Sequence, residues 1–208
     1  KVFYNFVDIN RFNPNKIKIN IQKEKEKLGI NNGDFVIGFA GRLIESKGWK
    51  EFILATNIIF KKNKKIKSLI AGDGQDKKEM VYLIKKLKLN NNVIYLGYIS
   101  NMVWFYLLLD CFVIPSHWEP MGLTEIEAQS MKVPVISSNV AALNEVIKDK
   151  ENGLLFEAKN SKDLSKKILY LYKNKKLRKQ LIKNSLETVK NYSLKEYLIR
   201  LYKIYRSL

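Results

Sequence analysis

The stretch His117-Trp-Glu-Pro-Met-Gly-Leu-Thr-Glu-Ile-Glu127 lies between two short apolar runs, residues 110–116 and residues 134–136. A proline and a glycine interrupt it just before residues 123–130, where we expect a helix. The order of strand, loop, helix and strand is that of an α/β sheet. The stretch therefore predicts a loop that connects a buried strand to the helix after it.

The start of this helix has the chemistry of an anion site. The first backbone amides, near Leu123, Thr124 and Glu125, have no partner within the helix and carry a partial positive charge, which suits a phosphate group. Glu119 before the helix and Glu127 in its second turn place two carboxylates beside the same loop. Carboxylates accept hydrogen bonds from hydroxyl groups. A ligand with both phosphate and hydroxyl groups is a nucleotide-sugar.

The composition is that of an ordinary globular domain: 208 residues, of which 46% are hydrophobic. No run of about 18 or more apolar residues occurs, so we expect no transmembrane helix. Cys111 is the only cysteine, which excludes an intrachain disulfide and a cysteine-based metal site and agrees with a cytoplasmic location. The chain starts at Lys1 without an initiator methionine or a secretory signal, so we expect an excised piece of a longer protein.

The net charge of +18 raises the question of an anionic partner. The lysines are scattered in short groups, such as residues 61–67, 85–88 and 173–176. No RNA-binding signature or helix-turn-helix pattern accompanies them, so we expect no nucleic-acid partner. Two alternatives stay open: a solvated basic surface, or a peripheral contact of the intact protein with an anionic membrane at its inner face.

Short apolar runs alternate with helical patterns between residues 34 and 156. Strands are expected at residues 35–40, 66–71, 93–96, 110–115, 133–137 and 152–156. Helices are expected between them, one of them capped by Ser46, and three more follow, at residues 161–172 with Ser161 at the cap, at 177–190, and from Ser193 onward. We predict an α/β fold with a Rossmann-like, open, mostly parallel sheet and helices on both faces.

The loop after the first expected strand combines Gly41, Arg42 and Lys47. Two cations and free amides at one such loop form a cradle for a polyphosphate. One charge pair at 4 Å contributes roughly 4 kcal/mol at an effective dielectric of 20, before desolvation. The alternatives are a surface ion pair between Arg42 and Glu45, and a solvated Lys47.

Three further candidates lie in loops. The sequence Gly72-Asp-Gly74 lacks the third glycine of a dinucleotide fingerprint, so Gly74 either lets the backbone approach a flat ligand or makes a tight turn. Tyr98 either lies near a base or is packed. His117, the only histidine, either donates a single hydrogen bond or contacts the transferring group, and a lone histidine is poor evidence for a metal site.

Residues 119–128 read E-P-x-G-L-x-x-x-E-A, which resembles the signature of retaining family 4 glycosyltransferases of the GT-B fold. Gly41-Arg-Leu43 with Lys47-Gly48 is similar to the donor-phosphate motif of that family. Asp110, with Pro115-Ser116, resembles the usual lead into its glutamate loop. The resemblance covers almost the entire chain.

The resemblance implies the donor-binding half of an enzyme that transfers a hexose-type sugar, with retention, from a UDP- or GDP-sugar to a glycan or lipid-linked acceptor. Arg42 and Lys47 would hold the diphosphate, and Glu119 the hydroxyls of the transferred sugar. The other donor contacts implied are Glu127 at the ribose, Tyr98 and Ile99 by the base, and amides around Gly122, Leu123 and Thr124. No metal and no cofactor are implied, because cationic side chains neutralise the leaving diphosphate.

The resemblance also implies a division of the chain: residues 1–20 as an inter-domain connector, 21–190 as the nucleotide-sugar-binding domain, and 191–208 as a helix that packs on a missing N-terminal, acceptor-binding domain. Two departures from the family pattern leave open whether the donor pocket is altered. Lys132 replaces a glycine and must accept a strained backbone or change the turn, and Ala141-Ala142 replaces a Gly-Gly loop near the donor phosphate. The competing classes are a GT-B-related epimerase or phosphorylase, and a non-catalytic basic binding module.

Overall fold

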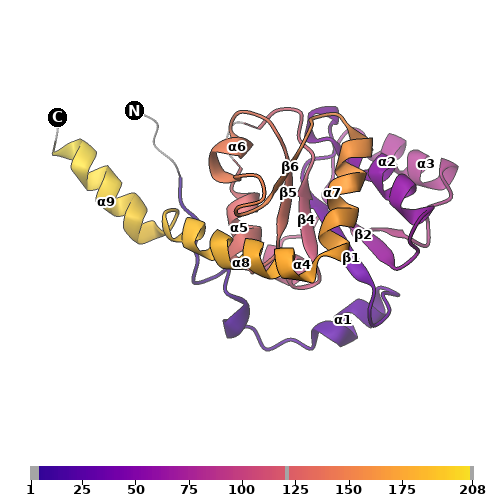
Figure 1. Ribbon diagram of the computed structural model, residues 1–208, viewed down its shortest axis with the longest axis horizontal. Coiled ribbons are helices and arrows are strands. Elements are labelled where there is room, and N and C mark those ends of the chain that lie inside the picture. Colours follow the sequence, from indigo (N-terminus) through magenta and orange to yellow (C-terminus); the bar gives the residue numbers. More distant parts are fainter. Residues whose placement is uncertain (1–4, 120–121, 207–208) are drawn as a thin grey trace.

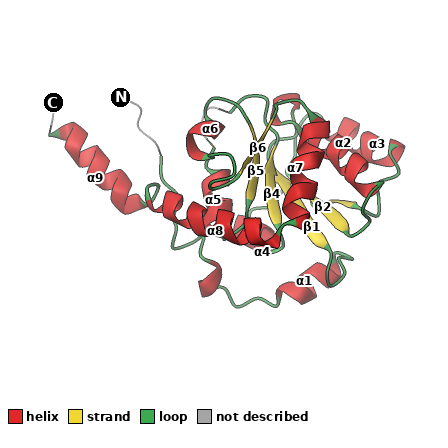
Figure 2. Ribbon diagram, in the orientation of Figure 1, coloured by secondary structure: helices red, strands yellow, loops and turns green. Residues whose placement is uncertain are grey.

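The computed structural model describes residues 5–119 and 122–206, and a parallel sheet runs through its centre (Figures 1 and 2). The strands are β1 (Phe35–Ala40), β2 (Ile66–Ala71), β3 (Val93–Tyr95), β4 (Cys111–Ile114), β5 (Val135–Ser138) and β6 (Leu154–Phe156). Their order is β3-β2-β1-β4-β5-β6, and every neighbouring pair is parallel. The predicted α/β class and the position of each strand are therefore confirmed.

The strands are apolar on both faces because helices cover both faces. Phe35, Ile37 and Phe39 of β1 point into one core, whereas Val36 points into the other. Gly38 also lies on the second face, where a methyl group would meet the side chain of Leu109 at 2.4 Å. The continuous apolar runs of the sequence thus correspond to strands with no solvent-exposed face.

One face of the sheet is covered by α2 (Trp49–Phe60), α3 (Lys77–Lys86) and α7 (Ser161–Lys173), which supply its first core. The other face is covered by α4 (Met102–Leu107), α5 (Thr124–Ser130) and α6 (Leu143–Val146). The helix α8 (Lys175–Lys190) contributes Leu177 and Leu181 to the first core and Val189 to the second. Two short segments, η1 (Pro14–Lys16) and α1 (Ile21–Lys27), precede the sheet.

Two of the predicted helix caps are wrong. Ser46 lies inside the 3-10 turn η2 (Glu45–Lys47), and α2 begins after Gly48, which has φ +70° and offers no capping side chain. The cap of α7 is Asn160, whose side chain accepts from the amide of Asp163, rather than Ser161. In the first case a 3-10 turn and the left-handed Gly48 separate Ser46 from the helix, and in the second Asn160 supplies the capping side chain one residue before Ser161. Ser193 does cap the last helix, α9 (Leu194–Tyr205), as predicted.

The N-terminal segment of the described chain contacts the junction between α8 and the helix after it. The amide of Val7 donates to Tyr192 O at 2.9 Å, and the rings of Phe6 and Tyr197 are 5.0 Å apart. Beyond this contact α9 (Leu194–Tyr205) projects away from the body of the molecule (Figure 1), and Leu198 and Tyr205 are 51% and 70% exposed. The apolar stripe of α9 is therefore outside both cores, and the proposed division at residues 20 and 190 stays a prediction.

The strand order reverses between β1 and β4, which lie side by side although β2 and β3 separate them in the sequence. In open α/β sheets, ligands bind at such a switch point, outside the carboxyl ends of the strands.

Among the described helices none is long and apolar enough to cross a membrane.

Candidate functional site

The loops that leave β1 and β4 are in direct backbone contact. The amide of His117 donates to Ser46 O at 2.8 Å. A methyl group on Gly48 would lie 1.9 Å from Pro115 O, so only glycine allows this approach, and its φ of +70° adds a second reason for glycine. The two loops therefore form one rigid floor at the switch point.

An ion pair connects the two loops above this floor. Lys47 Nζ lies 2.6 Å from Glu119 Oε2, and Ser116 Oγ donates to the same oxygen at 3.2 Å. The two charged side chains are only 19% and 13% exposed. Because the pair is largely removed from water, its charges interact more strongly than those of a surface pair.

Two adjoining cavities open along the carboxyl ends of the strands. The larger has a volume of about 430 Å³ and the smaller about 210 Å³, and they share Ala40, Gly41 and Thr124. Arg42 and Glu127 line the larger cavity. The smaller cavity is lined by Lys47, Glu119, Gly122 and Leu123, among others. The structure thus brings both predicted cations and both predicted carboxylates to one continuous site.

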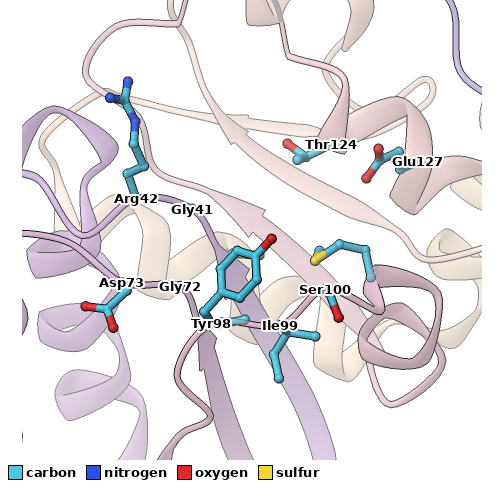
Figure 3. A pocket seen from close by; sticks show the side chains of 12 residues that line it. Gly41, Arg42, Gly72, Asp73, Tyr98, Ile99, Ser100, Thr124 and Glu127 are labelled. Carbon is cyan, nitrogen blue, oxygen red and sulfur yellow. The ribbon is translucent and has the colours of Figure 1, made fainter.

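Arg42 and Glu127 occupy opposite ends of the larger cavity, with Tyr98 between them (Figure 3). Arg42 is exposed, and no ion pair or side-chain hydrogen bond joins it to a described residue, so the alternative pair with Glu45 is not formed. Its donors are available to a ligand. Tyr98 is 77% exposed rather than packed, and it shares the rim with Ile99 and Ser100.

Glu127 is oriented by a neighbour from α4. The hydroxyl of Tyr106 donates to Glu127 Oε2 at 2.9 Å. Burial raises the pKa of Glu127, while the hydrogen bond from Tyr106 and the charge of Arg11 act in the opposite direction. One carboxylate oxygen is therefore held in place, and the other can accept a hydrogen bond from a ligand hydroxyl.

Two predicted site residues lie outside the linings of both cavities. His117 Nε2 is 3.0 Å from Glu51 Oε2 on α2, with an alignment that is poor for a hydrogen bond, so His117 contacts the helix behind the site. Gly74 packs against the backbone of Leu43, where a methyl group would be 2.4 Å from Leu43 O. A close approach of the backbone, one of the two roles expected for Gly74, is therefore observed. The group that approaches Gly74 is the backbone of Leu43 and not a ligand.

Several lining residues were not among the sequence candidates: Asp73, Ser100 and Met102. They follow β2 and β3, so their position at strand exits was a signal that could have identified them. Glu125 lies inside α5 rather than at a strand exit, so its position in the sequence did not mark it as a site residue. Pro120 of the signature lies outside the described residues. Across residues 5–119 and 122–206, no group of three or more His, Cys, Asp or Glu side chains is arranged so that it could hold a metal ion.

Comparison with known sequences identifies a family. The sequence model described as "Glycosyl transferases group 1" matches residues 20–188. The capsular polysaccharide biosynthesis glycosyltransferase CapM of Staphylococcus aureus is 32% identical over 182 residues, which cover 85% of this chain and 47% of CapM. The chain spans about half the length of the curated relatives it matches.

Comparison with solved structures agrees. The C-terminal domain of the group 1 glycosyl transferase LpcC from Francisella tularensis superposes with a TM-score of 0.79 at 32% identity, covering 90% of this chain and 99% of that domain. A mutant of TarM from S. aureus, in complex with UDP and other ligands, superposes with a TM-score of 0.77 at 26% identity, covering 84% of this chain and 37% of TarM. The sheet and its helices have the Rossmann-like fold of the C-terminal domain of GT-B enzymes.

Proposed function

The chain belongs to the group 1 glycosyl transferases, and from this premise we propose that it is the donor-binding domain of an enzyme that transfers a hexose-type sugar from a nucleotide-diphosphate sugar to an acceptor with retention of configuration. The observation that carries the proposal is the pair of adjoining cavities at the switch point, with Arg42 in one and Lys47 beside Glu119 in the other.

The two cavities suit the two ends of such a donor. The larger one offers the exposed ring of Tyr98 and the side chain of Ile99 to a base, and the accepting oxygen of Glu127 to ribose hydroxyls. UDP is our first choice of nucleotide, because TarM was solved with UDP. The smaller cavity would hold the sugar, with its hydroxyls donating to Glu119.

The diphosphate would lie where the cavities meet, within reach of Arg42, Lys47 and the amides near Gly122 and Thr124. In the reaction the acceptor oxygen bonds to the anomeric carbon as the bond from that carbon to the diphosphate oxygen breaks. Attack from the same face lets the departing phosphate take the acceptor's proton. The cations stabilise the charge that develops on the diphosphate, so we expect no metal requirement. Glu119 acts by positioning the sugar.

The acceptor is expected to bind a preceding domain, so the chain alone should bind the donor and transfer little. A glycan or a lipid-linked glycan is the acceptor class that we propose. A cytoplasmic location and a peripheral contact of the basic surface with an anionic membrane stay predictions, and vesicle co-sedimentation of the full enzyme at low and high salt tests the second.

Amide chemical shifts of the 208-residue chain, recorded with millimolar UDP-glucose and GDP-mannose in parallel, test donor binding. We expect perturbations at Arg42, Tyr98 and Thr124 with one of the two. Lys47→Ala should weaken binding about ten-fold or more, since it removes a charge that would contact the diphosphate. The matched control is Lys50→Ala, an exposed lysine in the first turn of α2, the helix that follows η2, which pairs with Glu79 at 3.6 Å. Absence of any perturbation by either nucleotide would contradict the proposal.

The competing classes give different results in the full enzyme. An epimerase releases free nucleotide without an acceptor, and a phosphorylase requires inorganic phosphate or a bound cofactor. A basic binding module would bind nucleic acid or anionic vesicles equally well after Glu119→Ala and Glu127→Ala, with a strong dependence on salt.

A further inference from the structure

Glu125, in the first turn of α5, lies between Glu119 and Glu127 in the sequence but does not face either cavity. Its carboxyl group instead lies directly behind Gly122. A methyl group on Gly122 would be 1.8 Å from Glu125 Oε2 and 2.5 Å from Oε1. Gly122 has no positive φ, so the need for glycine here comes from the adjacent carboxyl group.

The Glu125 side chain is fully buried, and neither of its oxygens accepts a well-aligned hydrogen bond from another described residue. The backbone amide of Glu125 itself lies close to its carboxyl group and lowers the pKa of that group. Such burial is unfavourable for an ionised carboxylate and much less so for a neutral acid. The ionisable groups around it are Glu119, Glu127, Lys47, Tyr106 and Tyr192. Two of the five are carboxylates and one is a cation, so these groups together with the amide of Glu125 offset a charge on Glu125 only in part.

We propose that Glu125 is a positioning residue of the donor site: its carboxyl group supports Gly122 from behind and so fixes Gly122 and Leu123, which line the smaller cavity. The part of this inference that concerns the donor rests on the proposed function. The part that concerns the loop does not.

The support depends on the protonation of Glu125. Burial raises the pKa of Glu125 to about 8; the charges of Glu119 and Glu127 act in the same direction, whereas its own backbone amide and the charge of Lys47 act in the opposite direction. The side chain is therefore neutral at pH 7 and ionises above about pH 8. Once ionised, it would add a third negative charge beside the place proposed for the diphosphate, and it would gain hydration by moving outward against Gly122.

The loop part is tested without any ligand, through the amide resonances of Gly122, Leu123 and Thr124 between pH 6 and pH 9.5. In the wild-type chain we expect them to shift with a common midpoint near pH 8. Glu125→Gln keeps the shape of the neutral acid and cannot ionise, so it should remove this transition. Glu79→Gln, at an exposed carboxylate, is the matched control and should leave the transition in place. A wild-type chain without the transition, or the same transition in Glu125→Gln, overturns the inference.

A double-mutant cycle tests the contact itself. Gly122→Ala should displace Leu123 and Thr124, seen as large shifts of their amides, because the new methyl group overlaps the Glu125 carboxyl group. The same substitution in a Glu125→Ala background should shift them much less, since the overlap is gone. Equal shifts in both backgrounds would show that the carboxyl group does not support Gly122.

The donor part is tested by the affinity for UDP-glucose, whose diphosphate does not titrate between pH 7 and pH 9. We expect wild-type affinity to fall about ten-fold over this range and that of Glu125→Gln to stay within about two-fold. Parallel loss in both proteins overturns a role of Glu125 in donor binding. If UDP-glucose binds neither protein while the ligand-free transition behaves as expected, the proposed donor fails and the positioning of the loop by Glu125 stands.

Discussion

The side of the sheet where the strands end (the carboxyl edge) and the side where they begin (the amino edge) each have basic side chains around a cavity. These basic side chains have different partners on the two sides. At the carboxyl edge, Arg42 has no described partner and Lys47 pairs with Glu119. At the amino edge, a cavity of about 260 Å³ is lined by Leu109, Asp110, Lys132, Pro134, Lys175, Arg178, Lys179 and Ile182. Positive charge alone therefore does not distinguish the proposed donor site from the opposite edge.

Arg178 shows what differs. Its Nη1 donates to the carbonyl oxygens of Leu171 and Tyr172, at 2.6 and 2.7 Å, and its guanidinium lies 5.2 Å from the ring centre of Phe35. These contacts tie the end of α7 to the start of α8. Arg178 thus stabilises the fold, whereas the free donors of Arg42 remain available for a ligand. The partners of a cationic side chain therefore identify a binding site better than the number of such side chains does.

The largest effect should come from Glu125, the buried acid of the carboxyl edge. Its pKa is raised by burial to about 8 in the folded chain, from about 4.3 when unfolded, so the folded state retains a proton that the unfolded state loses. The wild-type free energy of unfolding should therefore fall as pH rises from about 4.3 to 8. Glu125→Gln should escape this loss and be more stable at pH 8, with an upper bound of roughly 5 kcal/mol.

Urea unfolding of both proteins at pH 4.5, 6.5 and 8.5 measures this difference. A gap between them that does not widen with pH would contradict it. Glu79→Gln provides the baseline for an exposed glutamate.

The next effect tests the amino edge. Arg178→Ala removes two partly buried hydrogen bonds to carbonyl groups and the contact with Phe35, so we expect a loss of about 2–3 kcal/mol in the free energy of unfolding. Affinity for UDP-glucose should stay within about two-fold. Denaturant melts and a ligand titration on the same sample give both values. A large loss of affinity in a folded variant would erase the contrast between the two edges.

Arg42→Ala should show the reverse pattern. It removes no contact with a described residue, so stability should change by less than about 0.5 kcal/mol. Affinity for UDP-glucose should fall about ten-fold, or roughly 1.4 kcal/mol, because a charge beside the diphosphate is lost. Arg42→Lys should recover part of the affinity. An unchanged affinity would remove Arg42 from the proposed donor site.

The smallest effect concerns Lys132 at the amino edge, which has φ +61°. Glycine adopts this conformation without strain, so Lys132→Gly should raise stability by about 0.5–1 kcal/mol, less the value of the exposed hydrogen bond from its Nζ to Asn15. A thermal melt measures the change. A clear loss of stability would mean that the basic side chain matters more at this edge than its backbone does.

Much of the fold was predictable because local signals and the sheet agree. Apolar runs without alternation gave strands covered on both faces, and the helical spacing of Trp49, Phe52 and Ile53 identified the buried side of α2. The cap at Ser46 was wrong because α2 starts only after the left-handed Gly48, and the cap at Ser161 was wrong because Asn160, one residue earlier, supplies the capping side chain. The strain at Lys132 was predictable because only the missing glycine had to be noticed.

The residues of the site were predictable from the sequence, but the contacts between their side chains were not. Strand exits brought Arg42, Lys47, Glu119 and Glu127 together, as expected. The pairing of Lys47 with Glu119 depends on how two distant loops pack, which no spacing in the sequence encodes. Glu125 was not foreseen as a buried acid, because its burial depends on what packs around α5 rather than on the residues beside it.

The contact between Lys47 and Glu119 also bears on discrimination between ligands. A polyanionic ligand that attracts the Lys47 ammonium group leaves the Glu119 carboxylate without its counter-ion in a largely buried site. Inorganic pyrophosphate repels that carboxylate through its negative charge, whereas a neutral sugar hydroxyl can donate a hydrogen bond to it. Binding would thus be an exchange of partners that favours the complete donor over abundant cellular anions.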